Sequence, residues 1–257
     1  MSEPITEAVI LMAGAGSRFQ RNGETRLKPL VPIAGQPLIC YLLETLVESG
    51  IKTIHAVLGF ERDVLRRELE PLIAPELNIH WIDNPRWRLK KNGVSLLAAA
   101  PHMQKPFLLT MADHLFSEPI VDLLIAERRP GWLNVAIDRK IDSIFDLEDA
   151  MKVETRGEHI VAIGKELTTY DAIDTGVFVC PPAFFRYLER SKRDGDCSLA
   201  DGVQAMARDG FVRGIDIGAA WWQDVDTPEM LTRAEERLRR DHRREEREQV
   251  TQRAIVR

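Results

Sequence analysis

The segment AVILMAGAG (residues 8–16) decides the fold class, because six apolar residues in a row lead into a Gly-Ala-Gly turn. Such a run without polar alternation is typical of a strand buried on both faces in a parallel sheet. Pro37 and Gly50 then bracket a helical pattern over residues 38–49, with proline at its start and glycine just past its end. A second apolar run, KTIHAVLG (52–59), completes a strand-helix-strand unit.

Strand and helix patterns continue to alternate over the first half of the chain. Residues 61–70 and 92–100 have helical patterns, and residues 78–83 and 105–111 have strand patterns. This alternation predicts right-handed crossovers and a mostly parallel, Rossmann-like sheet with helices on both faces. We therefore expect an α/β fold that binds its ligands at the carboxyl ends of the strands.

The second half has a different pattern, with short strands and tight turns around two helical stretches. Its strand patterns lie at 132–138, 150–157, 158–164, 175–180 and 211–218. No Ser/Gly-rich or Pro-rich linker separates the two halves. We interpret residues 1–240 as one domain, with a nucleotide-binding half (1–132) and a smaller acceptor-binding lobe that covers the substrate (133–240).

Residues 241–257 form a charged tail, in which Arg and Glu predominate. The charges have mixed signs, which weakens any field that could attract a lipid surface or a partner. We interpret this tail as a solvated or frayed helix without an assigned function.

Composition excludes several classes of protein. The 257 residues carry 35 Lys and Arg against 40 Asp and Glu, so no overall basic field can hold nucleic acid. The apolar runs are far shorter than the roughly 18 residues of a transmembrane segment, and the acidic N-terminus does not fit a secretion signal. Cys40, Cys180 and Cys197 lie too far apart for a zinc motif. We expect a cytoplasmic protein.

The glycine turn is followed by two cations at a defined spacing. Nine residues separate GAGSR (14–18) from KPLVPIAGQPLI (28–39), so Arg18 and Lys28 flank a loop whose backbone amides can approach phosphate oxygens. The residues Phe-Gln-Arg at 19–21 fit neither the third glycine of a dinucleotide-binding turn nor the Gly-Lys-Ser/Thr of a Walker loop. Two cations beside one glycine loop indicate a polyphosphate ligand of another kind.

This opening resembles that of the sugar-nucleotidyltransferase superfamily, which has an apolar strand, G-x-G-x-R, and Lys-Pro-Leu-x-Pro before a helix. The resemblance implies the GT-A-like fold of that superfamily. It implies that Arg18 contacts the β- and γ-phosphates of a nucleoside triphosphate and that Lys28 lies against the α-phosphate. The residues that it places around the triphosphate are Met12, Ala13, Gly14, Ala15, Gly16 and Ser17.

Later segments narrow the resemblance to the CTP:inositol-1-phosphate cytidylyltransferase family, whose relatives act on phosphocholine and phosphonates. The similar segments are residues 91–100, 110–117, 138–153, 160–178 and 221–231. The resemblance implies transfer of CMP from CTP to a phosphorylated small alcohol, with inositol 1-phosphate as the acceptor and CDP-inositol and pyrophosphate as products. The positions that depart from the usual family residues are Met12, Lys91, Val94 and Ala112.

Three aspartates are candidates for binding Mg²⁺. Asp113 follows the apolar strand FLLTM, so its carboxylate emerges at the carboxyl edge of the sheet, where a hard oxygen ligand can hold the ion. Asp224 and Asp226 alternate across a turn or short strand, so only one of them faces Asp113 directly. We favour Asp226, and Asp224 stays open. Asp226 or Thr227 could instead cap the helix predicted over 229–238.

The resemblance also places residues around the acceptor. It implies that Lys165 holds the acceptor phosphate and that Asp174, Thr175 and Gly176 lie near the acceptor hydroxyls. Lys152 is a second candidate for the phosphate, although strand alternation could equally place it in solvent.

A third set of residues belongs to the cytidine. Asn92, Gly93 and Ser95 open a helix, and Asn92 could serve only as its cap. The resemblance places Gly93 and Ser95 near the cytosine and the ribose. His114, beside Asp113, suggests a general base, but a phosphate monoester is already ionised near neutral pH. We therefore expect His114 to position its neighbours.

Three alternative functions stay open. One is the same transfer to phosphocholine or to a phosphonate, a second is a glycosyltransferase that uses a nucleotide-sugar, and a third is a non-catalytic nucleotide-binding protein. No Ser-His-Asp, Cys-His or paired-carboxylate arrangement is recognisable, which argues against hydrolysis. The expected partners are CTP, Mg²⁺ and a small phosphorylated acceptor, and a homodimer is compatible with the sequence.

Overall fold

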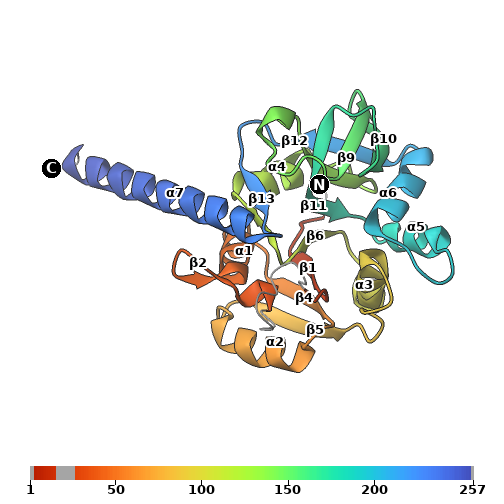
Figure 1. Cartoon of the computed structure of the whole chain (residues 1–257), viewed down its shortest axis with the longest axis horizontal. Coiled ribbons are helices and arrows are strands. Elements are labelled where there is room, and N and C mark those ends of the chain that lie inside the picture. The colour runs from red at the N-terminus through yellow and green to blue at the C-terminus, as the bar shows by residue number, and fades with distance from the viewer. Residues whose placement is uncertain (1–2, 16–26, 256–257) are drawn as a thin grey trace.

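A nine-stranded sheet runs through the molecule and carries the functional site (Figure 1). The computed structural model describes residues 3–15 and 27–255, with side chains as far as Asp241. The strands are, in spatial order, β5 (Asn78–Asp83), β4 (Thr53–Leu58), β1 (Glu7–Met12), β6 (Phe107–Met111), β11 (Ala172–Cys180), β8 (Leu133–Asp138), β12 (Val212–Asp216), β10 (His159–Gly164) and β9 (Lys152–Arg156).

β1 lies inside the first half of this sheet, between β4 and β6, and pairs with both in parallel. Val9 and Leu11 point into the core on one face, and Ala8, Ile10 and Met12 point into the core on the other. Each of the five side chains is at most 6% exposed. The predicted strand, buried on both faces, is therefore confirmed. Ala13 and Gly14 follow it directly and lie at the carboxyl edge of the sheet.

Helices cover both faces of the sheet, and the predicted α/β fold is confirmed. One face carries α1 (Leu38–Glu48), α2 (Arg62–Leu69) and α4 (Pro119–Glu127), and the other carries α3 (Asn92–Ala99), α5 (Phe184–Ser191) and α6 (Leu199–Arg208). Short 3-10 turns are η2 (Lys28–Leu30), η3 (Glu70–Leu72), η4 (Ala100–His102) and η5 (Ile141–Ser143). α1 begins after Pro37 and ends before Gly50, whose φ of +82° suits glycine.

β11 joins the two halves of the chain. It pairs antiparallel with β6 on one side and with β8 on the other. The register with β8 shifts between Asp174 and Phe178, and Gly176 within that irregularity has a φ of +75°. The sheet is therefore parallel through residues 1–132 and mixed in the second half, with no break between the two.

Two small ribbons lie outside the main sheet and are absent from the sequence prediction. β2 (Pro32–Ile33) pairs with β3 (Gln36–Pro37), and β7 (His114–Phe116) pairs with β13 (Trp222–Asp224). Strands of two or three residues are too short to leave an alternating pattern. The second ribbon is functionally important, because it brings residues from distant parts of the chain to the edge of β6.

The helix predicted over 229–238 is the first part of α7 (Pro228–Ile255). Leu231, Ala234 and Leu238 pack against a small core that includes Val31 and Leu38. Beyond that core, α7 projects away from the body of the molecule (Figure 1). No helix among the described residues is long and apolar enough to cross a membrane.

Candidate active site

The ammonium group of Lys28 lies between two carboxylates that come from distant parts of the chain. Lys28 opens η2, Asp113 follows β6, and Asp226 precedes α7. The Lys28 Nζ lies 2.6 Å from Asp113 Oδ2 and also donates to Asp226 Oδ1. Pro29 is the second residue of the 3-10 turn, whose backbone directs Lys28 across the carboxyl edge of the sheet. The structure therefore brings together three of the residues singled out in the sequence.

Electrostatics keep Lys28 and Asp113 charged. Burial alone would lower the pKa of Lys28, but the carboxylates of Asp113 and Asp226 outweigh it and raise that pKa above its ordinary value. Burial alone would raise the pKa of Asp113, but Lys28 and His114 outweigh it and hold that pKa well below its usual range. Lys28 and Asp113 are consequently both charged at neutral pH, and together with Asp226 they form the triad of this site.

Asp224 and Asp226 take different places. Asp226 contacts Lys28, whereas Asp224 pairs with His114 in the β7–β13 ribbon, and burial raises the pKa of its carboxyl. Thr227 caps α7, since its Oγ1 accepts a hydrogen bond from the Met230 amide at 3.2 Å. Capping and the contact with Lys28 therefore fall on neighbouring residues, Thr227 and Asp226.

His114 braces Asp113. Its Nδ1 lies 2.6 Å from Asp113 Oδ1, and Asp113 raises the pKa of the imidazole against the lowering effect of burial. On its other side, a Cβ at Gly176 would come within 2.4 Å of the imidazole ring. Trp222 lies nearly parallel to the ring, with 6.4 Å between the centroids. These contacts hold the orientation of the imidazole, and through it that of the Asp113 carboxylate.

A cavity of about 800 Å³ opens beside the triad, between the sheet edge, the loop after β8 and the start of α7. This volume lies within the range of roughly 300 to 1,000 Å³ that ligand pockets span. The predicted site residues that line it are Asn92, Asp113, Lys165, Asp174, Gly176, Asp224 and Asp226.

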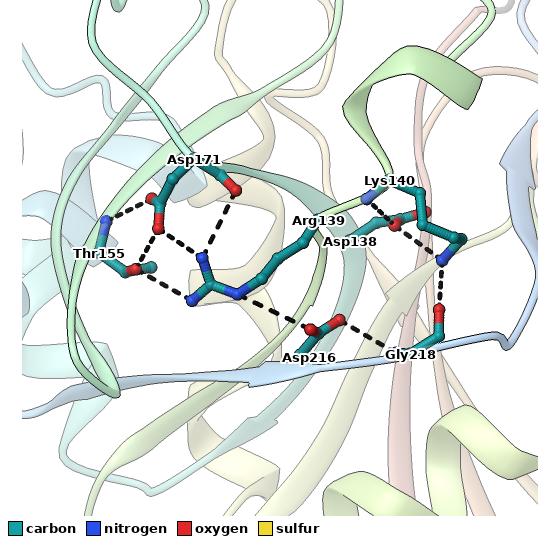
Figure 2. A network of polar contacts seen from close by, with 7 residues as sticks. All are labelled: Asp138, Arg139, Lys140, Thr155, Asp171, Asp216 and Gly218. Carbon is teal, nitrogen blue, oxygen red and sulfur yellow. Dashed lines mark hydrogen bonds and ion pairs between the residues drawn. The ribbon is translucent and has the colours of Figure 1, made fainter.

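One wall of the cavity contains Asp138, which the sequence motifs do not single out. Its Oδ1 accepts hydrogen bonds from the amide and the ammonium of Lys140, both at 2.8 Å, and its Oδ2 accepts one from Trp222 Nε1 at 2.9 Å. Figure 2 shows Lys140 reaching on to the Gly218 carbonyl, 2.6 Å away. Asp138 therefore fixes Trp222 against the cavity. The neighbouring Arg139 points the other way.

The Arg139 side chain ties four strands together behind this wall (Figure 2). It pairs with Asp171 and with Asp216, and it donates to Thr155 Oγ1 at 3.0 Å. Asp171 also accepts a 2.7 Å hydrogen bond from the Thr155 amide. This network anchors the end of β8, so the loop that follows starts from a defined position.

The two candidate lysines differ in their surroundings. Lys165 lines the cavity and pairs with Asp149 in the loop after β8. Lys152 is 9% exposed, and its ammonium donates to the carbonyls of Lys165 (2.7 Å) and Glu148 (3.2 Å). The solvent-exposed alternative for Lys152 is therefore wrong, because the turn after β10 covers it. Its contacts position the backbone around Lys165.

In the segment Asp174-Thr175-Gly176 of β11, neighbouring side chains point to opposite faces of the sheet, toward the cavity or toward the interior. Asp174 lines the cavity, accepts a 2.8 Å hydrogen bond from the Gly176 amide, and has its pKa raised to about 6 by burial. Thr175 is fully buried and donates to the Ala136 carbonyl at 2.9 Å, so its side chain faces the interior. Asp174 is therefore the member of this segment whose side chain faces the cavity, and its role toward an acceptor stays a prediction.

The residues predicted around cytidine are packed tightly. Asn92 Oδ1 accepts a 2.9 Å hydrogen bond from the Leu199 amide, and a Cβ at Gly93 would lie 2.6 Å from the Cys197 carbonyl oxygen. Ser95 is buried, and its Oγ accepts a hydrogen bond from the Asn84 side chain at 3.0 Å. The first two contacts join α3 to the start of α6 and the residues before it, and the third joins α3 to the residue after β5. A role in base recognition stays a prediction.

The triphosphate loop is described only in part. Met12 and Ala13 are buried at the end of β1, and the Ala13 carbonyl accepts a hydrogen bond from the Phe60 amide at 3.1 Å. Among the described residues, nothing lies within 4 Å of a Cβ built at Gly14, and Ala15 follows it. Gly16, Ser17 and Arg18 lie outside the described residues.

The triad also fits a magnesium ion. Asp113 and Asp226 offer carboxylate oxygens, the donors that Mg²⁺ prefers, and both already face one cation, the Lys28 ammonium. Among residues 3–15 and 27–241 no three acidic, histidine or cysteine side chains gather as a metal site. Phosphate oxygens and water would complete the coordination, as is usual for Mg²⁺.

The chain resembles known proteins in sequence and in fold. The profile of the MobA-like NTP transferase domain matches residues 8–166. The chain belongs to this family. The resemblance inferred from the motifs is confirmed, and the chain is an enzyme domain of the nucleotidyltransferase type.

Curated relatives agree with this assignment. The chain is 33% identical over 245 residues to a bifunctional IPC transferase and DIPP synthase of Thermococcus kodakarensis and 31% identical over 231 residues to one of Rubrobacter xylanophilus. These matches cover 90% and 89% of this chain but only 50% and 51% of the relatives. The chain therefore spans about half the length of the curated relatives it matches.

Solved structures agree on the fold. The inositol-1-phosphate CTP transferase from T. maritima matches with a TM-score of 0.81 and 25% identity, over 92% of this chain and 96% of that one. A UDP-glucose pyrophosphorylase complexed with UDP-glucose matches with a TM-score of 0.75 at 17% identity, over 92% and 99%. The second similarity concerns the fold alone.

Proposed function

We propose that this domain transfers CMP from CTP to inositol 1-phosphate and releases pyrophosphate. An oxygen of the acceptor phosphate attacks the α-phosphorus of CTP, and the bond from that phosphorus to the β-phosphate oxygen breaks. The observation that carries the proposal is the Lys28 ammonium held between two carboxylates at the cavity, in a chain similar to an inositol-1-phosphate CTP transferase.

Lys28 has the central role in this reaction. Its charge is fixed in a partly buried site, so it can stabilise negative charge that develops on the α-phosphate without reorganisation. Asp113 and Asp226 would hold Mg²⁺, which supplies further charge neutralisation when it is bound. No proton needs to be removed from the ionised acceptor phosphate, so catalysis consists of positioning and electrostatic stabilisation.

The acceptor wall favours a neutral polyol over an ammonium group. An ammonium ligand would be held by an anionic cage or by free aromatic faces, and the aromatic faces of this wall are partly occupied. In this cavity the Arg233 guanidinium lies 4.0 Å from the centroid of Phe145, and the Arg237 guanidinium lies 5.5 Å from the centroid of Trp221. The protein's own cations thus occupy one face of each ring, which disfavours phosphocholine. Asp174 offers a carboxyl to hydroxyl groups.

A pyrophosphate-release assay tests the proposal. CTP, UTP, ATP and GTP are each combined with inositol 1-phosphate, phosphocholine and 2-aminoethylphosphonate in the presence of Mg²⁺. We expect the highest kcat/KM for CTP with inositol 1-phosphate, and mass spectrometry should identify CDP-inositol. Faster turnover with another nucleotide or another acceptor would replace that part of the proposal.

We place the reaction in the cytoplasm, since the three cysteines are unpaired thiols.

A further inference from the structure

Both carboxylates that contact Lys28 flank the β7–β13 ribbon. Asp113 directly precedes β7, and Asp226 follows the last residue of β13 by two positions. The Val225 amide, just before Asp226, donates a hydrogen bond to the Asp113 carbonyl at 2.9 Å, so the two segments are joined at this end of the ribbon. The separation of the two carboxylates therefore depends on how firmly the ribbon is held.

Within the described residues, one side-chain hydrogen bond joins β13 to the main sheet. The Trp222 Nε1 donates to Oδ2 of Asp138, the last residue of β8, at 2.9 Å. In its backbone pairing β13 contacts β7 alone. The Gln223 side chain connects it to α7, because it donates to the Met230 carbonyl at 2.6 Å. The indole is therefore the side chain that ties the ribbon to the acceptor-binding half.

The same aspartate also fixes the segment that enters β13. Asp138 Oδ1 accepts hydrogen bonds from the amide and the ammonium of Lys140, both at 2.8 Å. That ammonium donates in turn to the Gly218 carbonyl at 2.6 Å (Figure 2). The end of β8 thus holds the chain at two points around the start of β13, at Gly218 through Lys140 and at Trp222 directly.

The carboxylate of Asp138 is engaged by the protein itself. Although the residue lines the cavity, it is only 2% exposed. Three donors occupy its two oxygens, and all of them belong to Lys140 and Trp222. A buried carboxylate is stable only when such partners satisfy it. Asp138 therefore acts on its neighbours, and its influence on the reaction passes through them.

We propose that Asp138 is a positioning residue for the transfer, because it anchors the β7–β13 ribbon through Trp222. The anchor sets the placement of Asp226 relative to Asp113. His114 is the first residue of β7, so the anchor also fixes the imidazole that contacts Asp113. The kinetic part of this inference rests on the proposed function. A displacement of about 1 Å at a reacting centre can cost about 100-fold in rate, so a distant anchor can control turnover.

Hydrogen exchange, followed by mass spectrometry, measures the anchor without any turnover. Trp222→Phe keeps an aromatic ring and removes the indole N–H that bonds Asp138. The Ser117 amide donates to the Trp221 carbonyl at 3.0 Å, and the Val225 amide bonds the segment before β7, so the two amides report on the two ends of the ribbon. We expect both to exchange about tenfold faster in the variant, because opening the ribbon no longer breaks a hydrogen bond to a charged group.

Tyr187→Phe is the matched control. The Tyr187 hydroxyl also donates to an aspartate, Asp209 Oδ2, at 2.9 Å, and Tyr187 is half-buried as Trp222 is. It lies on α5, apart from β13 (Figure 1). The control should leave the exchange of the ribbon amides and the transfer rate within about twofold of the unchanged protein. Melting temperatures would verify that every variant is folded.

A second substitution, Asp138→Ala, removes the same hydrogen bond from its other partner. It should also accelerate exchange at both ends of the ribbon. If Asp138 acts through Trp222, the double variant should exchange no faster than the faster of the two single variants, because both changes break one interaction. Fully additive effects, or exchange at the rate of the unchanged protein in Trp222→Phe, would overturn the inference.

Kinetics test whether the anchor serves the reaction. Trp222→Phe should lower kcat about tenfold and raise the Mg²⁺ concentration that gives half the maximal rate. The KM for inositol 1-phosphate should stay within about twofold, since the displaced groups are Asp226 and Asp113 and not an acceptor contact. A raised acceptor KM with unchanged kcat and Mg²⁺ requirement would overturn the inference, because Trp222 would then act only as a wall of the acceptor site.

The two proposals fail separately. If no nucleotide and acceptor release pyrophosphate, but both ribbon amides exchange faster in Trp222→Phe and in Asp138→Ala, the transferase proposal falls and the anchor stands. If the unchanged protein releases pyrophosphate and both variants match its kcat and its Mg²⁺ requirement, only the positioning role falls.

Discussion

The two ends of the cavity use charge in different ways. At the Lys28 end, the ammonium is in direct contact with the carboxylates of Asp113 and Asp226. At the acceptor end, Asp138 is enclosed by hydrogen bonds, and burial raises the pKa of Asp174 to about 6. The proposed function assigns charge stabilisation during the transfer to the first end and recognition of the acceptor to the second.

The largest effect is expected from Asp113→Asn. The substitution removes a negative charge from the triad and leaves an amide beside Lys28 and His114. We expect kcat to fall by about 100-fold or more, with the loss most evident at limiting Mg²⁺. Steady-state rates over a Mg²⁺ titration would measure it, and circular dichroism would control for folding. Wild-type turnover at low Mg²⁺ would contradict the metal assignment.

A pair of lysine substitutions compares the two ends directly. Lys28→Ala should lower kcat with every acceptor by about 100-fold or more, because Lys28 is proposed to stabilise charge that develops only in the transition state. Lys165→Ala should raise the KM for the acceptor about tenfold with little change in kcat, because its proposed partner is the acceptor phosphate. The reverse pattern would mean that the two subsites are exchanged.

Asp174→Asn tests the acceptor end through stability. Because the folded pKa is about 6 and the ordinary value is 3.8, the protonated carboxyl is favoured by folding. Its contribution to stability is complete below about pH 4 and is lost as the pH rises to about 6. Relative to the wild type, the variant should therefore gain stability over that interval, by at most about 3 kcal/mol, and the gain should be constant above it. Urea unfolding between pH 4 and 8 would measure the difference, and a flat difference would contradict the raised pKa.

The smallest effect is expected from ending the chain at Arg240. This deletion keeps the apolar contacts of Leu231, Ala234 and Leu238, but removes Asp241, the partner of Arg237. The melting temperature should change by no more than about 2 °C, and the transfer rate should be retained. A lost activity in a folded, shortened chain would show that the end of α7 contributes to the site.

Local patterns determined the elements on which the site is built. The apolar run of β1, the Pro37 and Gly50 boundaries of α1, and the position of Asp113 after β6 depend on neighbours in the sequence, so periodicity and turn chemistry predict them. The spacing of the glycine turn and Lys28 likewise pointed to a nucleotide. Short strands such as β7 and β13 leave no such pattern, and the sequence does not predict them.

Contacts between distant residues were decided by the tertiary structure alone. Lys28 and Asp226 are 198 positions apart and meet because the β7–β13 ribbon returns the chain to the edge of β6. The burial of Lys152 and the role of Asp138 likewise depend on turns and side chains that no local spacing specifies. A sequence encodes which groups emerge at strand ends, but which of them touch depends on how the sheet, the ribbon and α7 pack together.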